Sequence, residues 1–301
     1  MLVVRTNTVF KFAGLLVCAL AFPGVTLADD ILQALRPMSG DSVIDLSRRG
    51  EHYLAIKTFR ETDGGSSTVA TGLAAAQSAW ALGLVDEARR LWDDLLNSRR
   101  LSKEESARVL LSRAMLEMQE KSYESARAFA ERGAALLQPS ELRAQLWLVV
   151  AESLVEQGIT TSATEFYERA KNEGAEQLRS EAAFRLGECQ LRLGRPDQAR
   201  FNFTSIPLQS EYAQAGLGRL VQIDFREKDY DSVLTWLKEG QQSYPREFDS
   251  PSFAYTHISA LLEIKRLDEA RAALREFKTK YSAANPWYIL AEAAYEARAS
   301  Q

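Results

Sequence analysis

Residues 147–170 read WLVVAESLVEQGITTSATEFYERA, and the chain repeats this unit with variations. Apolar residues in the first half recur three or four positions apart, which predicts one face of an α-helix. Gly158 follows as a helix stop, because glycine adopts the left-handed backbone conformation at little cost. Ala163, Tyr167 and Ala170 then repeat the helical spacing. The stretch therefore predicts a helix, a tight turn and a second helix.

Three features of this unit recur at intervals of 33 to 38 residues. Each unit has a turn residue, a small residue five positions later and, in most units, a bulky residue after four more. Two such helices cannot bury their apolar faces alone, so the recurrence indicates a stacked repeat protein. The turn residues are Gly50, Gly83, Lys121, Gly158, Gly194, Lys228 and Lys265; the small residues are Ala55, Ala88, Ala126, Ala163, Ala199, Val233 and Ala270; the third set is Phe59, Trp92, Ala130, Tyr167, Phe203, Leu237 and Leu274.

This pattern resembles the tetratricopeptide repeat over about residues 41–282. The resemblance implies an all-α fold, a right-handed α-solenoid of about seven helix–turn–helix repeats with a C-terminal capping helix. Three turns carry lysine instead of glycine, and Ala130 is small where a bulky residue is usual, so the repeats are degenerate. The expected repeats span approximately residues 41–64, 67–100, 104–138, 140–173, 176–207, 211–245 and 248–282, and the expected cap spans 286–299.

The composition is that of an ordinary globular protein. The 301 residues are 46% hydrophobic and 26% charged, and the formal net charge is −4. A mildly acidic chain is a poor general binder of nucleic acid, so we expect no nucleic-acid partner.

Residues 1–28 have the pattern of a secretory signal peptide. Arg5 and Lys11 supply a positive start, and the apolar run of 11 residues from Phe12 to Phe22 is too short to span a membrane. Small residues predict cleavage after Ala28. Residues 29–301, with a net charge of −6, would then form a periplasmic solenoid. An uncleaved N-terminal anchor is the alternative.

The sequence contains no catalytic constellation. His52 and His257 are far apart, and neither lies near a cysteine with the spacing of a zinc site or a thiol–imidazole pair. Cys18 would leave with the signal peptide, and Cys189 is predicted to be a buried core residue. Phosphate-binding loops, nucleophile elbows and calcium-binding loops are absent from the sequence. We therefore predict a protein that is not an enzyme and binds no cofactor or metal.

The resemblance also implies that the first helices of the repeats line a concave face. Projecting each first helix from its turn gives two inward apolar positions seven residues apart, with one more position between them. Such a stripe predicts a groove for an extended peptide or an amphipathic helix. The groove residues are Leu73, Trp80, Leu111, Met115, Met118, Leu148, Glu152, Val155, Phe184, Glu188, Leu191, Gln222, Phe225 and Tyr255, with Gln77 on the same line.

Other interpretations of this face stay open. Packing between adjacent first helices would produce the same apolar stripe. Glu152, Glu156, Glu181 and Glu188 form an acidic cluster that suits a solvated face, a basic partner segment, a cation or a carboxylate-pair hydrolase.

The favoured function is a protein–protein interaction scaffold in a bacterial cell-envelope assembly. Its partner would be a peptide or an amphipathic helix, and any membrane association would be indirect. A polysaccharide-binding or export-associated module that uses the aromatic groove residues is the alternative. Self-association through an array end also stays open.

Overall fold

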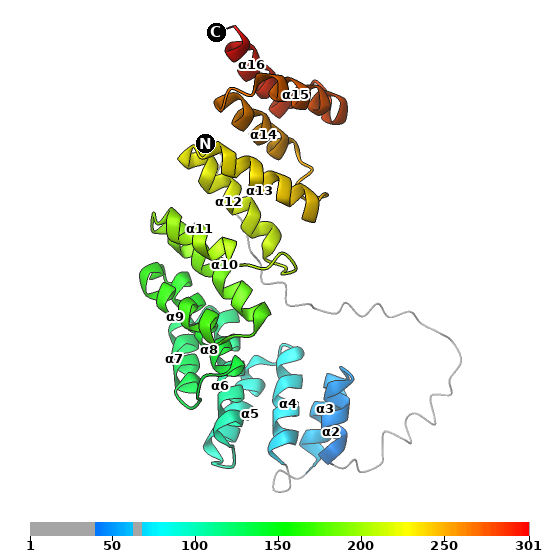
Figure 1. Ribbon diagram of the computed structural model, residues 1–301. Coiled ribbons are helices and arrows are strands. Elements are labelled where there is room, and N and C mark those ends of the chain that lie inside the picture. The colour runs from blue at the N-terminus through cyan, green and yellow to red at the C-terminus, as the bar shows by residue number, and fades with distance from the viewer. Residues whose placement is uncertain (1–39, 63–67, 301) are drawn as a thin grey trace, which may run out of the picture. The chain divides into compact units, whose positions relative to one another are not determined.

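The computed structural model describes residues 40–62 and 68–300 (Figure 1). The predicted signal peptide lies outside the described residues. The described chain consists of fifteen α-helices and contains no strand. The helices are α2 (Gly40–Arg48), α3 (His52–Glu61), α4 (Val69–Ala81), α5 (Val85–Asn97), α6 (Lys103–Gln119), α7 (Tyr123–Ala134), α8 (Glu141–Glu156), α9 (Thr160–Glu173), α10 (Glu176–Arg192), α11 (Pro196–Thr204), α12 (Ala213–Glu227), α13 (Tyr230–Ser243), α14 (Pro251–Glu263), α15 (Leu267–Tyr281) and α16 (Pro286–Ala299).

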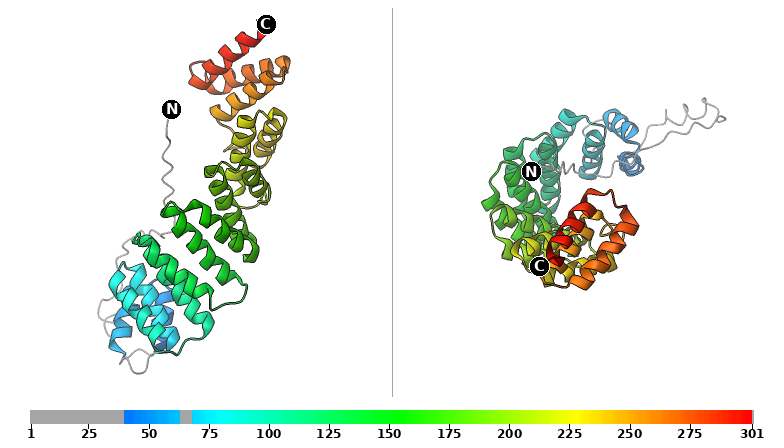
Figure 2. Two further views of the ribbon diagram at one scale, coloured as in Figure 1. Left: turned by 90° about the vertical axis from the view of Figure 1, so that its left-hand side faces the viewer. Right: turned by 90° about the horizontal axis from the view of Figure 1, so that it is seen from above.

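These helices form seven consecutive pairs followed by α16. In each pair an even-numbered helix, here called the first helix, packs against the odd-numbered second helix that follows it. Some first helices of successive repeats also touch, namely α2 with α4, α6 with α8 and α8 with α10, and the final helix α16 packs against α14. Figures 1 and 2 show that helices adjacent in sequence stay adjacent in space. The prediction of an all-α solenoid is therefore confirmed.

The small residue of each second helix lies at the centre of its repeat. All seven, from Ala55 to Ala270, have no exposed surface. The bulky residue four positions later packs beside it, and Tyr167 and Phe203 are each only 2% exposed. The first helix also approaches closely at Gly187, where an added Cβ would lie 2.7 Å from the ring of Phe203. Small and large side chains thus alternate between the helices and fill a core that divides into successive hydrophobic clusters along the array.

The turn between the helices of each pair has the same backbone conformation in every repeat. All seven predicted turn residues have positive φ, from 60° at Lys121 to 79° at Gly50. In the fourth repeat the backbone N–H of Gly158 donates to Val155 O at 2.9 Å, and that of Ile159 donates to Leu154 O at 2.8 Å. This left-handed cap satisfies carbonyl groups at the end of the first helix. Lysine occupies three of these turns without changing their geometry.

One second helix is much shorter than its neighbours. α11 has 9 residues, whereas α9 and α13 have 14 each. The chain leaves α11 after Thr204 and continues through Ile206 and Pro207, and proline lacks the N–H that would continue the helix. Among the described helices, none is both long and apolar enough to cross a membrane.

Candidate functional site

The predicted groove residues all lie on first helices, and the surface of these helices is here called the first-helix face. At its centre, α8 and α10 bring two carboxylates to one guanidinium. Arg185 Nε lies 3.8 Å from Glu152 Oε1, and another nitrogen of Arg185 lies 3.8 Å from Glu181 Oε1. Arg185 Nε is buried and has no hydrogen-bond acceptor among the described residues. These contacts are electrostatic and too long for hydrogen bonds.

A second ion pair continues the line from α10 to α12. Arg219 Nε lies 2.7 Å from Glu188 Oε1, and Arg219 also donates to Gln222 Oε1 at 2.9 Å. Two predicted residues, Glu188 and Gln222, are therefore brought together by an arginine that the sequence analysis did not single out. Arg185 was missed as well, although it lies four residues after Glu181, at the spacing that places two side chains on one helical face.

Glu152 is the most perturbed group in this line. Its side chain is 12% exposed, and burial raises the pKa of its carboxyl to about 7, against the opposing effect of Arg185. The unfolded carboxyl titrates near its ordinary pKa of about 4.3, so the folded state holds the proton more tightly than the unfolded state. Stability therefore falls as the pH rises from about 4.3 to about 7, and the loss is complete above that range.

The apolar groove residues serve the core as well as the surface. Leu148 is buried at 9% exposure, and the remaining apolar members are half-buried and pack against the core. Each of these side chains therefore has one side in the repeat stack and one side turned to solvent. The half-buried members are Leu73, Trp80, Leu111, Met115, Met118, Val155, Phe184, Leu191, Phe225 and Tyr255.

The aromatic groove residues are fixed by neighbouring rings. Trp80 meets Trp92 edge-on with centroids 5.7 Å apart, and its Nε1 donates to Gln119 Oε1 at 3.1 Å. At the other end of the array, Tyr255 on α14 lies 5.4 Å from Trp287 on α16, centroid to centroid. Trp287 is 42% exposed and was not predicted. A projection from the repeat turns does not reach Trp287, because it lies on α16, beyond the last repeat.

The two histidines and the cysteine lie on different helices, with His52 on α3, Cys189 on α10 and His257 on α14. His52 Nδ1 lies 3.2 Å from Ser78 Oγ, and burial lowers the pKa of His257. Cys189 is buried, as expected, and burial raises the pKa of its thiol to about 11, which keeps it protonated at neutral pH. The described residues contain no cluster of three or more histidine, cysteine or carboxylate side chains suited to a metal ion.

The stacked pairs, the left-handed turns and the first-helix face define an α-solenoid of helix–turn–helix repeats. The chain contains tetratricopeptide repeats, since residues 73–141 and residues 181–207 each match a family model described as tetratricopeptide repeat. No curated protein sequence matches the chain.

Solved structures with the same fold cover most of the chain. PilF of Pseudomonas aeruginosa is 17% identical with a TM-score of 0.53, over 69% of this chain and 94% of that one. The apo form of RapI is 13% identical with a TM-score of 0.51, over 77% and 96%. YrrB, described as a tetratricopeptide repeat protein with an unusual peptide-binding site, is 14% identical with a TM-score of 0.51, over 67% and 97%. At these identities the likeness shows the fold alone.

Proposed function

We propose that the chain is a non-catalytic interaction scaffold that binds a peptide or an amphipathic helix of a protein partner on its first-helix face. The observation that carries this proposal is the row of half-buried apolar side chains on successive first helices, beside the charged line from Glu152 to Gln222. Rigid apolar anchors next to a few oriented polar groups are the usual chemistry of a protein-binding surface. YrrB lends support, because a tetratricopeptide repeat protein of similar fold has a peptide-binding site.

Site-specific photo-crosslinking in the native cell tests this proposal. A photoreactive amino acid is placed at Gln77 or Gln222, which are exposed positions on the first-helix face. The matched controls are Ser125 and Ser162, which are exposed positions on the second helices α7 and α9. We expect one partner to crosslink from both first-helix positions and from neither control. Crosslinks to that partner from the controls alone would refute the assignment of the binding face.

The crosslinking positions avoid a weakness of truncating the aromatic anchors. Phe184 packs against Phe203 with centroids 5.6 Å apart, so its replacement by alanine would loosen a repeat as well as remove a contact. A loss of binding in that variant would not separate the two effects. Exposed glutamines leave the core intact, so a change in crosslinking reports contact with the partner.

We also propose that the protein works in the cell envelope after export. The support is the sequence of residues 1–28, with its positive start, short apolar run and small residues before Asp29. Cell fractionation followed by N-terminal sequencing tests it. We expect a periplasmic protein that begins at Asp29. An N-terminus that retains residues 1–28 in the membrane fraction would favour the anchor instead, and recovery from the cytoplasm would refute export.

A further inference from the structure

A hollow of about 270 Å³ lies between α11, α12 and α13. Most of its lining is apolar, and a single carboxylate, Glu239, also borders it. None of the predicted groove residues takes part, so the hollow is separate from the charged line and its apolar flanks. The apolar side chains that matter most here are Ile206, Pro207, Leu208, Leu217, Leu220 and Trp236.

The short second helix explains why space is left at this place. α11 ends at Thr204, about one turn and a half earlier than α9 or α13 would in the same position. The segment that replaces the missing turns runs through Ile206 and Pro207 and leaves Leu208 37% exposed. Leu217 and Leu220 of α12 are nearly buried and also line the hollow. The hollow is therefore an apolar gap between two second helices.

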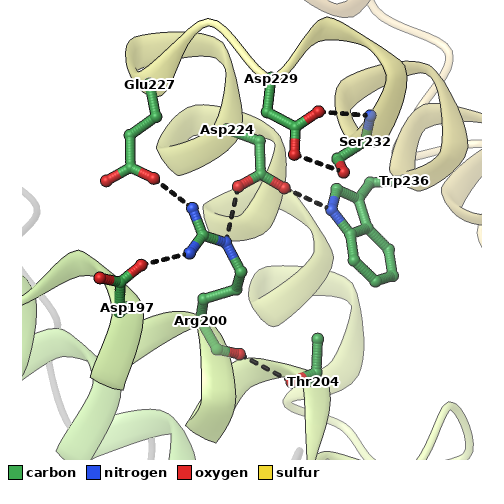
Figure 3. Close-up of polar contacts among 8 residues, drawn as sticks. All are labelled: Asp197, Arg200, Thr204, Asp224, Glu227, Asp229, Ser232 and Trp236. Carbon is green, nitrogen blue, oxygen red and sulfur yellow. Dashed lines mark hydrogen bonds and ion pairs between the residues drawn. The ribbon is translucent and has the colours of Figure 1, made fainter.

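A buried polar network fixes one wall of the hollow. Asp224 is 1% exposed, accepts from Trp236 Nε1 at 2.7 Å and accepts from Arg200 Nε at 2.8 Å (Figure 3). Arg200 also pairs with Asp197 at 2.7 Å and with Glu227. The indole is thus held by a carboxylate that is itself held in place. A wall fixed before binding loses little conformational entropy on binding, which favours affinity.

We propose that this hollow is an anchor pocket for one large apolar side chain, such as phenylalanine, from a partner protein segment that places a basic residue beside it. The hollow is smaller than the roughly 300–1,000 Å³ of a site for a drug-sized molecule, so it suits a single side chain. Apolar pockets that receive one bulky side chain dominate the energy of many protein interfaces. Glu239 on the border supplies a negative charge that a neighbouring lysine or arginine complements.

Binding of small probes to the purified protein tests the pocket without knowledge of the partner. The probe is N-acetyl-phenylalaninamide, and the readout is the indole N–H resonance of Trp236, which is assigned with a Trp236→Phe variant. A probe of this size should bind with a Kd on the order of 1 mM. N-acetyl-glutaminamide is the polar control and should leave the resonance unmoved. A wild-type resonance that does not move at ten times that concentration overturns the proposal.

Two variants that fill the hollow locate the binding. Ala213→Leu adds bulk from α12, and Thr204→Phe adds bulk from an exposed position at the end of α11, so it keeps the test valid if the first variant misfolds. Each should weaken probe binding at least tenfold. Ala215→Leu, at an exposed position on the same helix, is the matched control and should bind as the wild type does. Equal binding in the folded filled variants would overturn the proposal.

The charge preference is tested with two dipeptide amides. Acetyl-Phe-Lys-amide should bind roughly threefold more tightly than acetyl-Phe-Glu-amide at low salt, because an exposed charge pair contributes a modest free energy. Glu239→Gln should remove this difference and leave the affinity for N-acetyl-phenylalaninamide unchanged. If the difference persists in that variant, Glu239 does not select the basic residue, and that part of the proposal is wrong.

Discussion

Glycine in place of lysine at the left-handed turns should stabilise the array. Lys121, Lys228 and Lys265 have φ values of 60°, 64° and 61°, and all three side chains are exposed. A residue with a Cβ is disfavoured by about 1–2 kcal/mol in this conformation, because the Cβ crowds the neighbouring carbonyl oxygen. Four other repeats place glycine at the same position and close the same turn. The lysines therefore carry a backbone strain that glycine relieves.

Two smaller effects oppose the gain. Glycine loses about 0.4–1 kcal/mol more backbone entropy on folding, and a lysine near a helix C-terminus contributes roughly 0.3 kcal/mol through the helix dipole when exposed. The expected net gain is about 0.5 kcal/mol per turn. Alanine at the same position keeps the strain and removes the charge. The glycine variant should therefore exceed the alanine variant by about 1 kcal/mol at each turn.

Urea unfolding followed by circular dichroism measures these differences from the midpoint and slope. The reverse change, Gly158→Ala, is the matched control. Its φ is 77°, and no atom lies within 4 Å of the position that an added Cβ would take. Its cost of about 1 kcal/mol would thus come from the backbone alone. If the glycine and alanine variants of Lys121 are equally stable, a Cβ at this left-handed position causes no strain, and the reasoning is refuted.

Three further changes test the packing and the charges. Gly187→Ala should destabilise the protein by about 1–3 kcal/mol, because the added Cβ would lie 2.7 Å from the buried ring of Phe203. Gly218→Ala, whose added Cβ would lie 3.9 Å from Phe253, should be neutral or stabilising, and thermal unfolding measures both variants. Glu152→Gln should raise the free energy of unfolding by up to about 3 kcal/mol more at pH 8 than at pH 5, as measured by urea titrations at both pH values. An equal effect at the two pH values would contradict the raised pKa of Glu152. Asp224→Ala should cost about 2–3 kcal/mol, because it removes a buried carboxylate and leaves the half-buried Trp236 indole N–H and Arg200 without that acceptor. Asp197→Ala, at an exposed partner of the same arginine, should cost under about 1 kcal/mol.

The fold was predictable because every repeat requires a small residue at the same position, where its two helices cross. A residue such as Ala163 must be small, since two helices cross at its Cβ, and its counterparts all have no exposed surface. The turns were predictable even where lysine replaces glycine, because the position in the repeat, and not the residue alone, specifies the left-handed conformation. Lys228 illustrates this, as only its distance from Val233 marked it as a turn residue.

The charged line was only partly predictable. Glu152 and Glu188 were placed on the right helices, but their partners come from the next repeat. Arg219 lies 31 residues after Glu188, and the contact depends on how two first helices are offset along their axes. Sequence spacing within one helix gives no measure of that offset. The raised pKa of Glu152 could not be predicted from the sequence for the same reason, since burial by neighbouring repeats causes it.

The early end of α11 creates a hollow that the sequence pattern around Pro207 does not predict. Pro207 marks the end of the helix in the sequence, but the hollow exists because α13 keeps its full length beside it. The hollow shares no lining residue with the predicted groove, so a partner segment held at the hollow and another held on the first-helix face would contact different side chains and need not compete. Occupation of both by one partner would raise its effective concentration at the second site, and loss of either anchor would then weaken binding by more than that contact alone contributes. A scaffold with degenerate repeats gains specificity in this way, because the irregular repeat differs from all the others.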